Sequence, residues 1–344
     1  MNISDIDVKE YLLSLSRGEQ KVLLRELNDL SDRKGTISAI VSRREILDNK
    51  QGHCPHCGHP KYVKFGVDKG SQRYKCKSCN RNFTEYTGTW LEGIHKKELI
   101  DEYLQLMFEE KSLDKITELL GINKKTAFDW RHKILASLRD TDKISFDGIT
   151  ESDETFFLLS EKGCRHLERE GRKRGSTSSK KGISDEQVAV IVTADRQGAY
   201  EFDVAKLGRI TKKSIEDSIG DRISPKTVLC TDSHVSYKGF AIDNEIEHHP
   251  LRADLKQFVK DGVFHIQHVN SLHNRLKKWI TEKFWGVSTK YLQQYLNWFR
   301  MKEKLKNVTQ PIAELVRRTL ESTETIERYF RIEQNYEELL SSPI

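Results

Sequence analysis

Four of the six cysteines occur as two pairs, Cys54-Pro-His-Cys57 and Cys76-Lys-Ser-Cys79, with 18 residues between the pairs. Each C-x-x-C turn directs two thiolates at one ion, and two such turns at this distance are typical of a tetrahedral structural zinc site. A segment of about 35 residues buries little core, so metal binding would supply its folding free energy. The spacing therefore predicts a zinc ribbon with these four ligands, and disulfides are the alternative.

Two aspartates lie where acids are unusual. Asp153 falls in the middle of a predicted strand at 149–159, and Asp232 ends a second predicted strand at 227–231. Burying an acid among apolar residues is costly unless it meets a cation or another partner, and the carboxyl ends of strands are where active sites gather in α/β sheets. Side by side, two carboxylates would repel, and a divalent cation would relieve the repulsion. A pair of magnesium ions about 4 Å apart is the known arrangement for phosphodiester chemistry.

A polar helix face follows downstream. Asn270, His273 and Lys277 share one face of a predicted helix at i, i+3 and i+7. The opposite face is apolar and carries Ile266, Val269, Leu272, Leu276 and Ile280. Without the upstream acids such a polar stripe would be a solvated surface.

A helix-turn-helix is predicted between the ribbon and the first acid. Residues 112–120 form a short amphipathic helix, Gly121-Ile122 supplies the turn, and Asn123 caps the next helix. The inward positions are Ile116, Leu119, Leu120, Ala127, Trp130, Ile134 and Leu138. The outer face is expected to show Lys124, Lys125, Thr126, Arg131 and His132. Such a helix suits the major groove of DNA, and an ordinary helical hairpin with a solvated basic face is the alternative.

The charge is concentrated in two short segments. The chain of 344 residues has a formal net charge of +6, yet residues 53–90 hold seven basic and two acidic side chains, and residues 160–182 hold eight and three. The tail, 309–344, is acidic. Such patches attract a phosphate backbone, whereas solvated faces are the alternative. No apolar run approaches the roughly 20 residues of a membrane span, and the few cysteines indicate an intracellular protein.

The remaining pattern predicts an alternation of strands and helices. Helical spacing of apolar residues occurs at 6–30, 96–139, 211–219 and 266–305, and strand-like runs occur at 149–159, 188–195, 199–204 and 227–231. The segment 162–181 is rich in Gly, Ser, Lys and Arg and reads as a loop between the first two of these strands.

These residues together resemble the zinc-ribbon transposases of insertion sequences, in the ISXO-like group of the DDE superfamily. Members carry a ribbon, a helix-turn-helix and an RNase H-like core in the order found here, over roughly residues 50–305. The family's D-E-T/S and T-D-x-x-x-x-Y contexts are matched by Asp153-Glu-Thr155 and by Thr231, Asp232 and Tyr237. The family's H-x-N-x-x-[E/N]-x6-K element is matched by His265, Asn270 and Lys277, with Gln267 in place of the first Asn.

The resemblance implies a fold and a mechanism. The core would be an α/β, RNase H-like mixed sheet flanked by helices. Asp153 and Asp232 would hold two magnesium or manganese ions, Asn270 would complete the second ion's shell, and Lys277 would contact a phosphate. Asn270 is a neutral ligand and would hold a cation less tightly than a carboxylate, so Glu154 and His273 are further candidates for this shell.

The resemblance also implies the partners. The protein would bind the terminal inverted repeats of an insertion sequence, cleave them in a metal-dependent reaction and join the 3′-hydroxyl to target DNA. It would act as a homodimer or higher oligomer on double-stranded DNA, in the cytoplasm at the bacterial nucleoid and away from any membrane. The basic loop 160–182 would clamp DNA through Arg172, Lys173 and Arg174, or be a disordered insertion.

The predicted organisation has five parts. They are a helical segment (1–50), the zinc ribbon (51–90), a helix-turn-helix region (91–145), the catalytic core (146–308) and an acidic helical tail (309–344). Two other interpretations stay open. One is a catalytically weakened or domesticated transposase that acts as a DNA-binding regulator, because the third position is Asn270. The other is a metal-dependent nuclease or resolvase with the same core.

Overall fold

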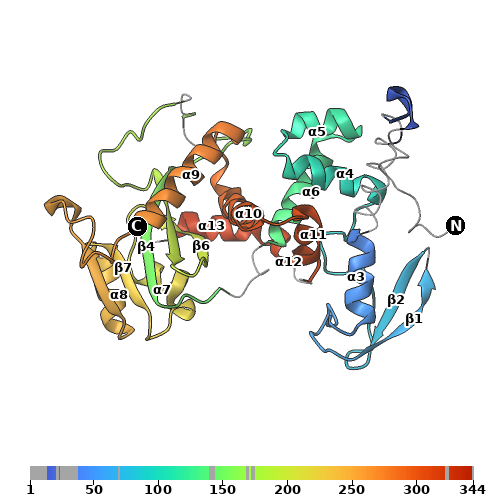
Figure 1. Ribbon diagram of the computed structural model, residues 1–344, viewed down its shortest axis with the longest axis horizontal. Coiled ribbons are helices and arrows are strands. Elements are labelled where there is room, and N and C mark those ends of the chain that lie inside the picture. The colour runs from blue at the N-terminus through green and yellow to red at the C-terminus, as the bar shows by residue number, and fades with distance from the viewer. Residues whose placement is uncertain are drawn as a thin grey trace.

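The computed structural model describes residues 14–20, 23, 38–68, 70–138, 144–167, 170–171, 175–321 and 325–342. A small β-ribbon lies at one end of the molecule, an α/β core at the other, and helices fill the space between them (Figure 1). Most of the predicted helical segment 6–30 lies outside the described residues. Within the described ranges, a helix with the length and apolar character of a membrane span is absent.

The ribbon is a three-stranded antiparallel sheet packed against a helix. Helix α3 (Ser38–Asp48) precedes strands β1 (Tyr62–Asp68), β2 (Ser71–Cys76) and β3 (Asn82–Thr84). The Tyr62 hydroxyl donates to the Leu47 carbonyl at 2.8 Å. Tyr74 and Phe83 are buried, and both rings pack with Tyr62 and Leu47. The end of α3 therefore belongs to the ribbon's small core.

The helix-turn-helix forms as its sequence indicates. The elements are η2 (Lys97–Leu99), α4 (Ile100–Phe108), α5 (Leu113–Leu120) and α6 (Lys124–Ala136). Ser112 caps α5 by accepting the Lys115 N–H at 3.2 Å, and Asn123 caps α6 by accepting the Thr126 N–H at 2.7 Å. Gly121 ends α5 with φ of 61°, a left-handed conformation that glycine adopts without strain. Leu119, expected to face inward, is 49% exposed.

The second half of α6 is buried, so the expected outer face is wrong for Arg131 and His132. Helix α6 packs against α10 (Leu292–Leu305) on the side that the sequence pattern left to solvent. Arg131 donates to the Lys111 carbonyl at 2.8 Å, and its guanidinium lies over the Trp298 ring. Burial lowers the pKa of His132 to about 4, and the neutral ring packs beside Tyr291.

The core is a five-stranded mixed sheet with the order β6-β5-β4-β7-β8. Strands β4, β5 and β6 are antiparallel neighbours, whereas β7 and β8 run parallel to β4. The bounds are β4 (Ile149–Leu158), β5 (Gln187–Asp195), β6 (Tyr200–Leu207), β7 (Val228–Asp232) and β8 (Glu247–Leu251). This order, with β4 in the centre, is the RNase H-like arrangement, and four of the strands match the predicted ranges to within about three residues.

Helices cover both faces of this sheet. Alternate residues of β5 point to opposite sides: Val190 and Val192 pack with α9 (Gln267–Phe284) and α10, and Ala189 and Ile191 pack with the other helices. Those other helices are α7 (Lys212–Ile219) and α8 (Val235–Asp243), accompanied in the chain by the short turns η3 (Gly220–Arg222), η4 (Ala253–Leu255) and η5 (Thr289–Tyr291). A strand with both faces covered is apolar throughout, which is why β5 is nearly continuously buried.

Two features of the core differ from the pattern. Strand β8 was not predicted, because its sequence Glu-His-His-Pro-Leu is polar and contains Pro250, which an edge strand tolerates. The helical pattern predicted at 266–305 is divided between two helices, α9 and α10. The break falls at Trp285, which adopts a left-handed conformation with φ of 52°.

The last three helices are α11 (Pro311–Glu321), α12 (Thr325–Phe330) and α13 (Ile332–Ser341). Helices α11 and α12 pack back on α3 and α6 of the N-terminal half, whereas α13 packs on η5 and β6 of the core. Arg43 in α3 donates to the Leu320 carbonyl at 2.8 Å, and the Trp90 indole donates to Thr319 Oγ1 at 3.0 Å. Figure 1 shows α11 and α12 beside α3 and α6. Helix α11, far along the chain, thus contacts both the helix that packs on the ribbon and Trp90, which follows the ribbon.

Replacing Arg131 with alanine tests its buried position. Arg131→Ala removes a buried hydrogen bond and the stacking on Trp298, so we expect the free energy of unfolding in urea to fall by about 2 kcal/mol. Lys125→Ala, on the exposed start of the same helix, should change it by less than about 0.5 kcal/mol. Equal stability of the wild type and Arg131→Ala would contradict this placement.

Candidate active site

The two predicted acids meet at one edge of the sheet. In the parallel pairing of β4 and β7, Glu151 lies beside Cys230, which places Asp153 level with Asp232 two residues further along. Carboxylate oxygens of Asp153, Glu154 and Asp232 all lie within 4.8 Å of one another. Glu154 alternates to the other face, yet its carboxylate joins the group because β7 ends at Asp232. Three acids therefore share one site, where the sequence pattern emphasised two.

The site disfavours negative charge. Burial, then repulsion from Glu154 and Asp232, raises the pKa of Asp153 to about 8. Burial and repulsion from Asp232 raise the pKa of Glu154 to about 7. Glu154 Oε2 is buried and has no hydrogen-bond partner among the described residues. Such an acceptor set suits a hard divalent cation, which would supply the missing partner and cancel the repulsion.

Helix α9 presents its polar face to these acids. His273 is buried, and its Nδ1 lies 3.9 Å from Asp153 Oδ2. Burial and the nearby Lys277 charge lower the pKa of His273 to about 4, so the imidazole is neutral at neutral pH. Lys277 also acts on Asp153, whose pKa it lowers. Asn270 is exposed one turn before His273, and its spacing places it on the same side of the helix as His273.

Glu151 fixes the start of α9 to the central strand. Its fully buried carboxylate accepts the backbone N–H of His268 at 2.9 Å and of Val269 at 3.2 Å. The residue that precedes the helix, Ile266, has no side chain able to cap it, so Glu151 takes the role of the capping residue from another element. The other oxygen meets Arg196 at 3.0 Å.

Sequence reasoning did not identify Glu151 as part of the site. A usable signal exists, because Glu151 and Asp153 are two residues apart on a strand and so point to the same face. His265 and His268 also lie against Glu151, and their ligand atoms fall within 4.8 Å of one another. The backbone amides and the Arg196 guanidinium already satisfy the carboxylate. This second cluster therefore holds the helix in place without an ion.

The four paired cysteines form a compact cluster. The Sγ atoms of Cys54 and Cys79 are 3.8 Å apart, those of Cys57 and Cys76 are 3.7 Å apart, and all four lie within 4.8 Å of one another. These distances exceed a disulfide bond of about 2.05 Å. They match the edge of roughly 3.8 Å that a tetrahedron with bonds of about 2.3 Å to zinc requires. The cluster fits a zinc ribbon.

The residues predicted to bind DNA have different outcomes. Lys124 and Lys125 are exposed at the start of α6, where they pair with Asp114 and Asp129 at 2.7 and 2.8 Å. Thr126 is half-buried beside them, and Arg131 is buried as described above. The predicted loop residues Arg172, Lys173 and Arg174 lie outside the described residues.

Two sequence comparisons match this chain to transposable-element proteins. Residues 145–303, which run from just before β4 nearly to the end of α10, match the ISXO2-like transposase domain. An uncharacterized protein in the transposable element ISH50 of Halobacterium salinarum is 26% identical over 259 residues, which cover 74% of this chain and 85% of that protein.

A solved pre-cleavage Mos1 transpososome is similar at 10% identity over 67% of this chain and 77% of that one, with a TM-score of 0.25. The α/β core is therefore the part of the chain that matches the ISXO2-like transposase domain. The predicted resemblance to insertion-sequence transposases is thereby confirmed.

Replacing Glu151 tests how α9 is held. Glu151→Ala leaves two helix amides and the Arg196 guanidinium buried without their acceptor, so we expect the free energy of unfolding in urea to fall by about 3 kcal/mol. The matched control is Glu247→Ala, which removes an exposed carboxylate bonded to His249 in the same sheet and should cost less than about 1 kcal/mol. Equal losses of stability in the two variants would contradict the role of Glu151 in holding the start of α9.

Proposed function

We propose that this transposase cleaves DNA at the ends of an insertion sequence and joins the freed 3′-hydroxyl to target DNA. The observation that carries the proposal is the meeting of Asp153, Glu154 and Asp232 inside the matched domain, with the pKa values of Asp153 and Glu154 raised by burial and repulsion. A site that resists negative charge in this way is suited to hold divalent cations rather than to act through free carboxylates.

The acids would bind magnesium or manganese, and Asn270 would complete the shell. The bound ions would activate the attacking oxygen and stabilise the leaving oxygen of the phosphodiester. Lys277, exposed one turn beyond His273, would pair with a phosphate and hold the scissile strand over the acids. His273 stays neutral and keeps the face of α9 at a fixed distance from Asp153.

Binding of the element ends would fall to the N-terminal half. The ribbon segment 53–90 holds seven basic and two acidic side chains, and Lys124, Lys125 and Thr126 lie at the start of α6, where a recognition helix meets base edges. The basic loop with Arg172, Lys173 and Arg174 would contact target or flanking DNA. Cleavage of paired ends requires at least a dimer, acting on double-stranded DNA in the cytoplasm at the nucleoid.

A catalytically weakened regulator is the alternative, and it depends on Asn270. Asparagine supplies a neutral oxygen where a third carboxylate is usual. In this structure Glu154 places a third carboxylate within 4.8 Å of the other two. The number of acids at the site is therefore restored by a neighbouring residue, which favours the enzyme.

Replacing either aspartate should abolish cleavage and leave DNA binding intact. For Asp153→Asn and Asp232→Asn we expect a loss of at least about 1,000-fold in strand cleavage of an end-bearing fragment in magnesium, with unchanged binding of the same fragment by gel shift. Asp217→Asn, in an exposed ion pair on α7, is the matched control and should cleave normally. Normal cleavage by either aspartate variant would rule out the assignment.

The cysteine cluster should contain one zinc ion per chain. Elemental analysis of the purified protein should give about one zinc equivalent. Cys76→Ser should lose the metal and unfold the ribbon, because this domain buries too little apolar surface to fold alone. Cys230→Ser, which alters a buried cysteine of the core sheet, should keep its zinc. A zinc-free wild type would exclude the ribbon metal site.

A further inference from the structure

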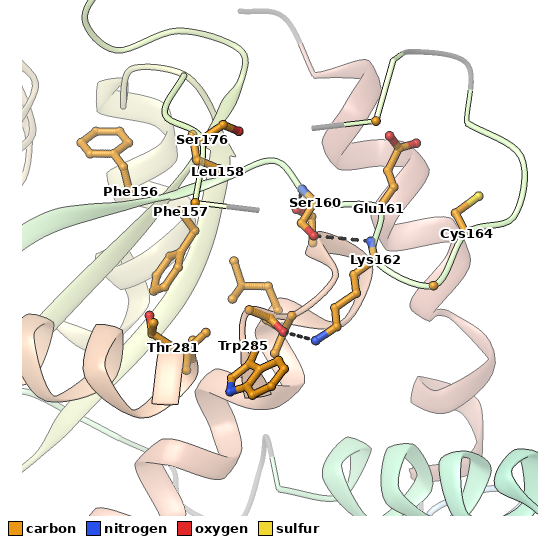
Figure 2. A pocket seen from close by; sticks show the side chains of 18 of the residues that line it. Phe156, Phe157, Leu158, Ser160, Glu161, Lys162, Cys164, Ser176, Thr281 and Trp285 are labelled. Carbon is orange, nitrogen blue, oxygen red and sulfur yellow. Dashed lines mark hydrogen bonds between the residues drawn. The ribbon is translucent and has the colours of Figure 1, made fainter. Parts of the chain in front are cut away.

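A groove of about 830 Å³ lies between β4 and the end of α9. Residues of β4, of the end of α9, of the segment after it and of the segment between 160 and 176 line it. Phe157 in β4, Thr281 in α9 and Trp285 at the end of α9 are among its lining residues (Figure 2). Lys277 lines the groove and also acts on Asp153, whose pKa it lowers. Lys277 therefore connects the groove with the proposed catalytic site.

Each of the two elements that bear the site residues also carries an aromatic side chain that lines the groove: Phe157 on β4 and Trp285 at the end of α9. On β4, Asp153 and Phe157 are four residues apart and point to the same face, roughly 13 Å along the strand. On α9 and its end, positions 273, 277, 281 and 285 follow one another at the spacing of a helix turn and form a single stripe. The stripe extends roughly 18 Å from His273 to Trp285, about the length of five stacked nucleotides at about 3.4 Å each.

Trp285 occupies a position that favours a small residue. It ends α9 with φ of 52°, a conformation that is strained for a non-glycine residue and is usually filled by Gly or Asn. Two contacts from Lys162 hold this turn: its Nζ donates to the carbonyls of Phe284 and Gly286 at 2.6 and 2.8 Å. The indole is 69% exposed. A large aromatic ring is thus presented to solvent on a rigid but unfavourable backbone.

We propose that this groove binds unpaired nucleotides of the DNA strand that leaves the acid cluster, and that one base stacks on the Trp285 indole. The proposal rests on the proposed function and names the form of DNA held beside the cut. An unpaired base offers its face to a ring, whereas bases within a duplex stack on each other. Lys277 supplies positive charge between the acids and the ring, where the backbone of the strand would pass.

The groove's chemistry is that of single-strand binding sites. These sites combine positive charge along the backbone with aromatic side chains on which bases stack, and they tolerate any sequence because every base has a π-face. Phe157 forms the opposite wall from the α9 stripe and is half-buried. Phe157 thus adds a second aromatic side chain to the groove's lining.

The fluorescence of Trp285 tests the proposal directly. The other four tryptophans, Trp90, Trp130, Trp279 and Trp298, are between 0 and 6% exposed, so among the tryptophans only Trp285 offers its ring to a base. We expect a thymidine oligonucleotide of about 12 residues to quench the emission of the full-length protein in a saturable manner. The same length of duplex should quench much less. Equal quenching by single strand and duplex would overturn the proposal.

Two variants separate stacking from folding. Trp285→Gly removes the ring at a position where glycine fits the backbone, so the protein should melt at or above the wild-type temperature. Its affinity for the labelled oligonucleotide, by anisotropy, should fall about 5- to 100-fold, the range expected for one stacked base. Trp285→Phe keeps a stacking surface and should stay within about threefold of wild type. Unchanged affinity in Trp285→Gly would refute the proposal.

Further controls keep the two proposals distinct. Phe330→Ala removes an aromatic ring that is 71% exposed in α12, outside the groove, and should bind the oligonucleotide as the wild type does. Asp153→Asn should retain quenching without cleavage. A wild type that quenches but never cleaves element ends would sink the proposed function and leave the groove standing. Cleavage by the wild type together with normal oligonucleotide binding by Trp285→Gly would support the proposed function and overturn the proposal for the groove.

Discussion

The buried carboxylate of Glu151 joins the central strand to the first turn of α9, and the geometry of the site depends on it. A helix that begins without a capping side chain leaves its first amides unsatisfied, and here the strand supplies the acceptor. Because Glu151 and Asp153 point to the same face of β4, the residue that fixes the helix is one side chain away from the acid that the helix serves. The position of His273 beside Asp153 follows from this link.

The cluster of Asp153, Glu154 and Asp232 differs from Glu151 in how its negative charge is compensated. Glu151 is stabilised by amides and a guanidinium, whereas burial and repulsion from neighbouring acids raise the pKa values of Asp153 and Glu154. The same strand thus holds one carboxylate in a satisfied structural role and presents two others whose negative charge is disfavoured, with Asp232 beside them. This contrast supports the role proposed for the three acids, since strongly perturbed acids cluster at functional sites.

The local sequence pattern predicted much of this structure, whereas contacts between residues far apart in the chain determined the rest. Four of the five strands of the core sheet, and the position of Asp232, followed from apolar runs and from where they end. The burial of Arg131 could not be predicted in the same way, because the helix that covers it, α10, lies about 160 residues further along the chain. Glu151 resembled any strand residue until the first turn of α9 was placed over it. Trp285 lay inside an apparently continuous helical pattern, and only its backbone conformation shows where the helix ends.

The most direct test of the site is anomalous scattering from crystals soaked in manganese. We expect at least one peak within about 2.2 Å of carboxylate oxygens of both Asp153 and Asp232, with Glu154 or Asn270 near enough to complete the shell. Asp153→Asn crystals treated in the same way should lose or weaken that peak. A peak that instead falls among Glu151, His265 and His268, with none between the two aspartates, would contradict the assignment of structural and catalytic roles to the two clusters.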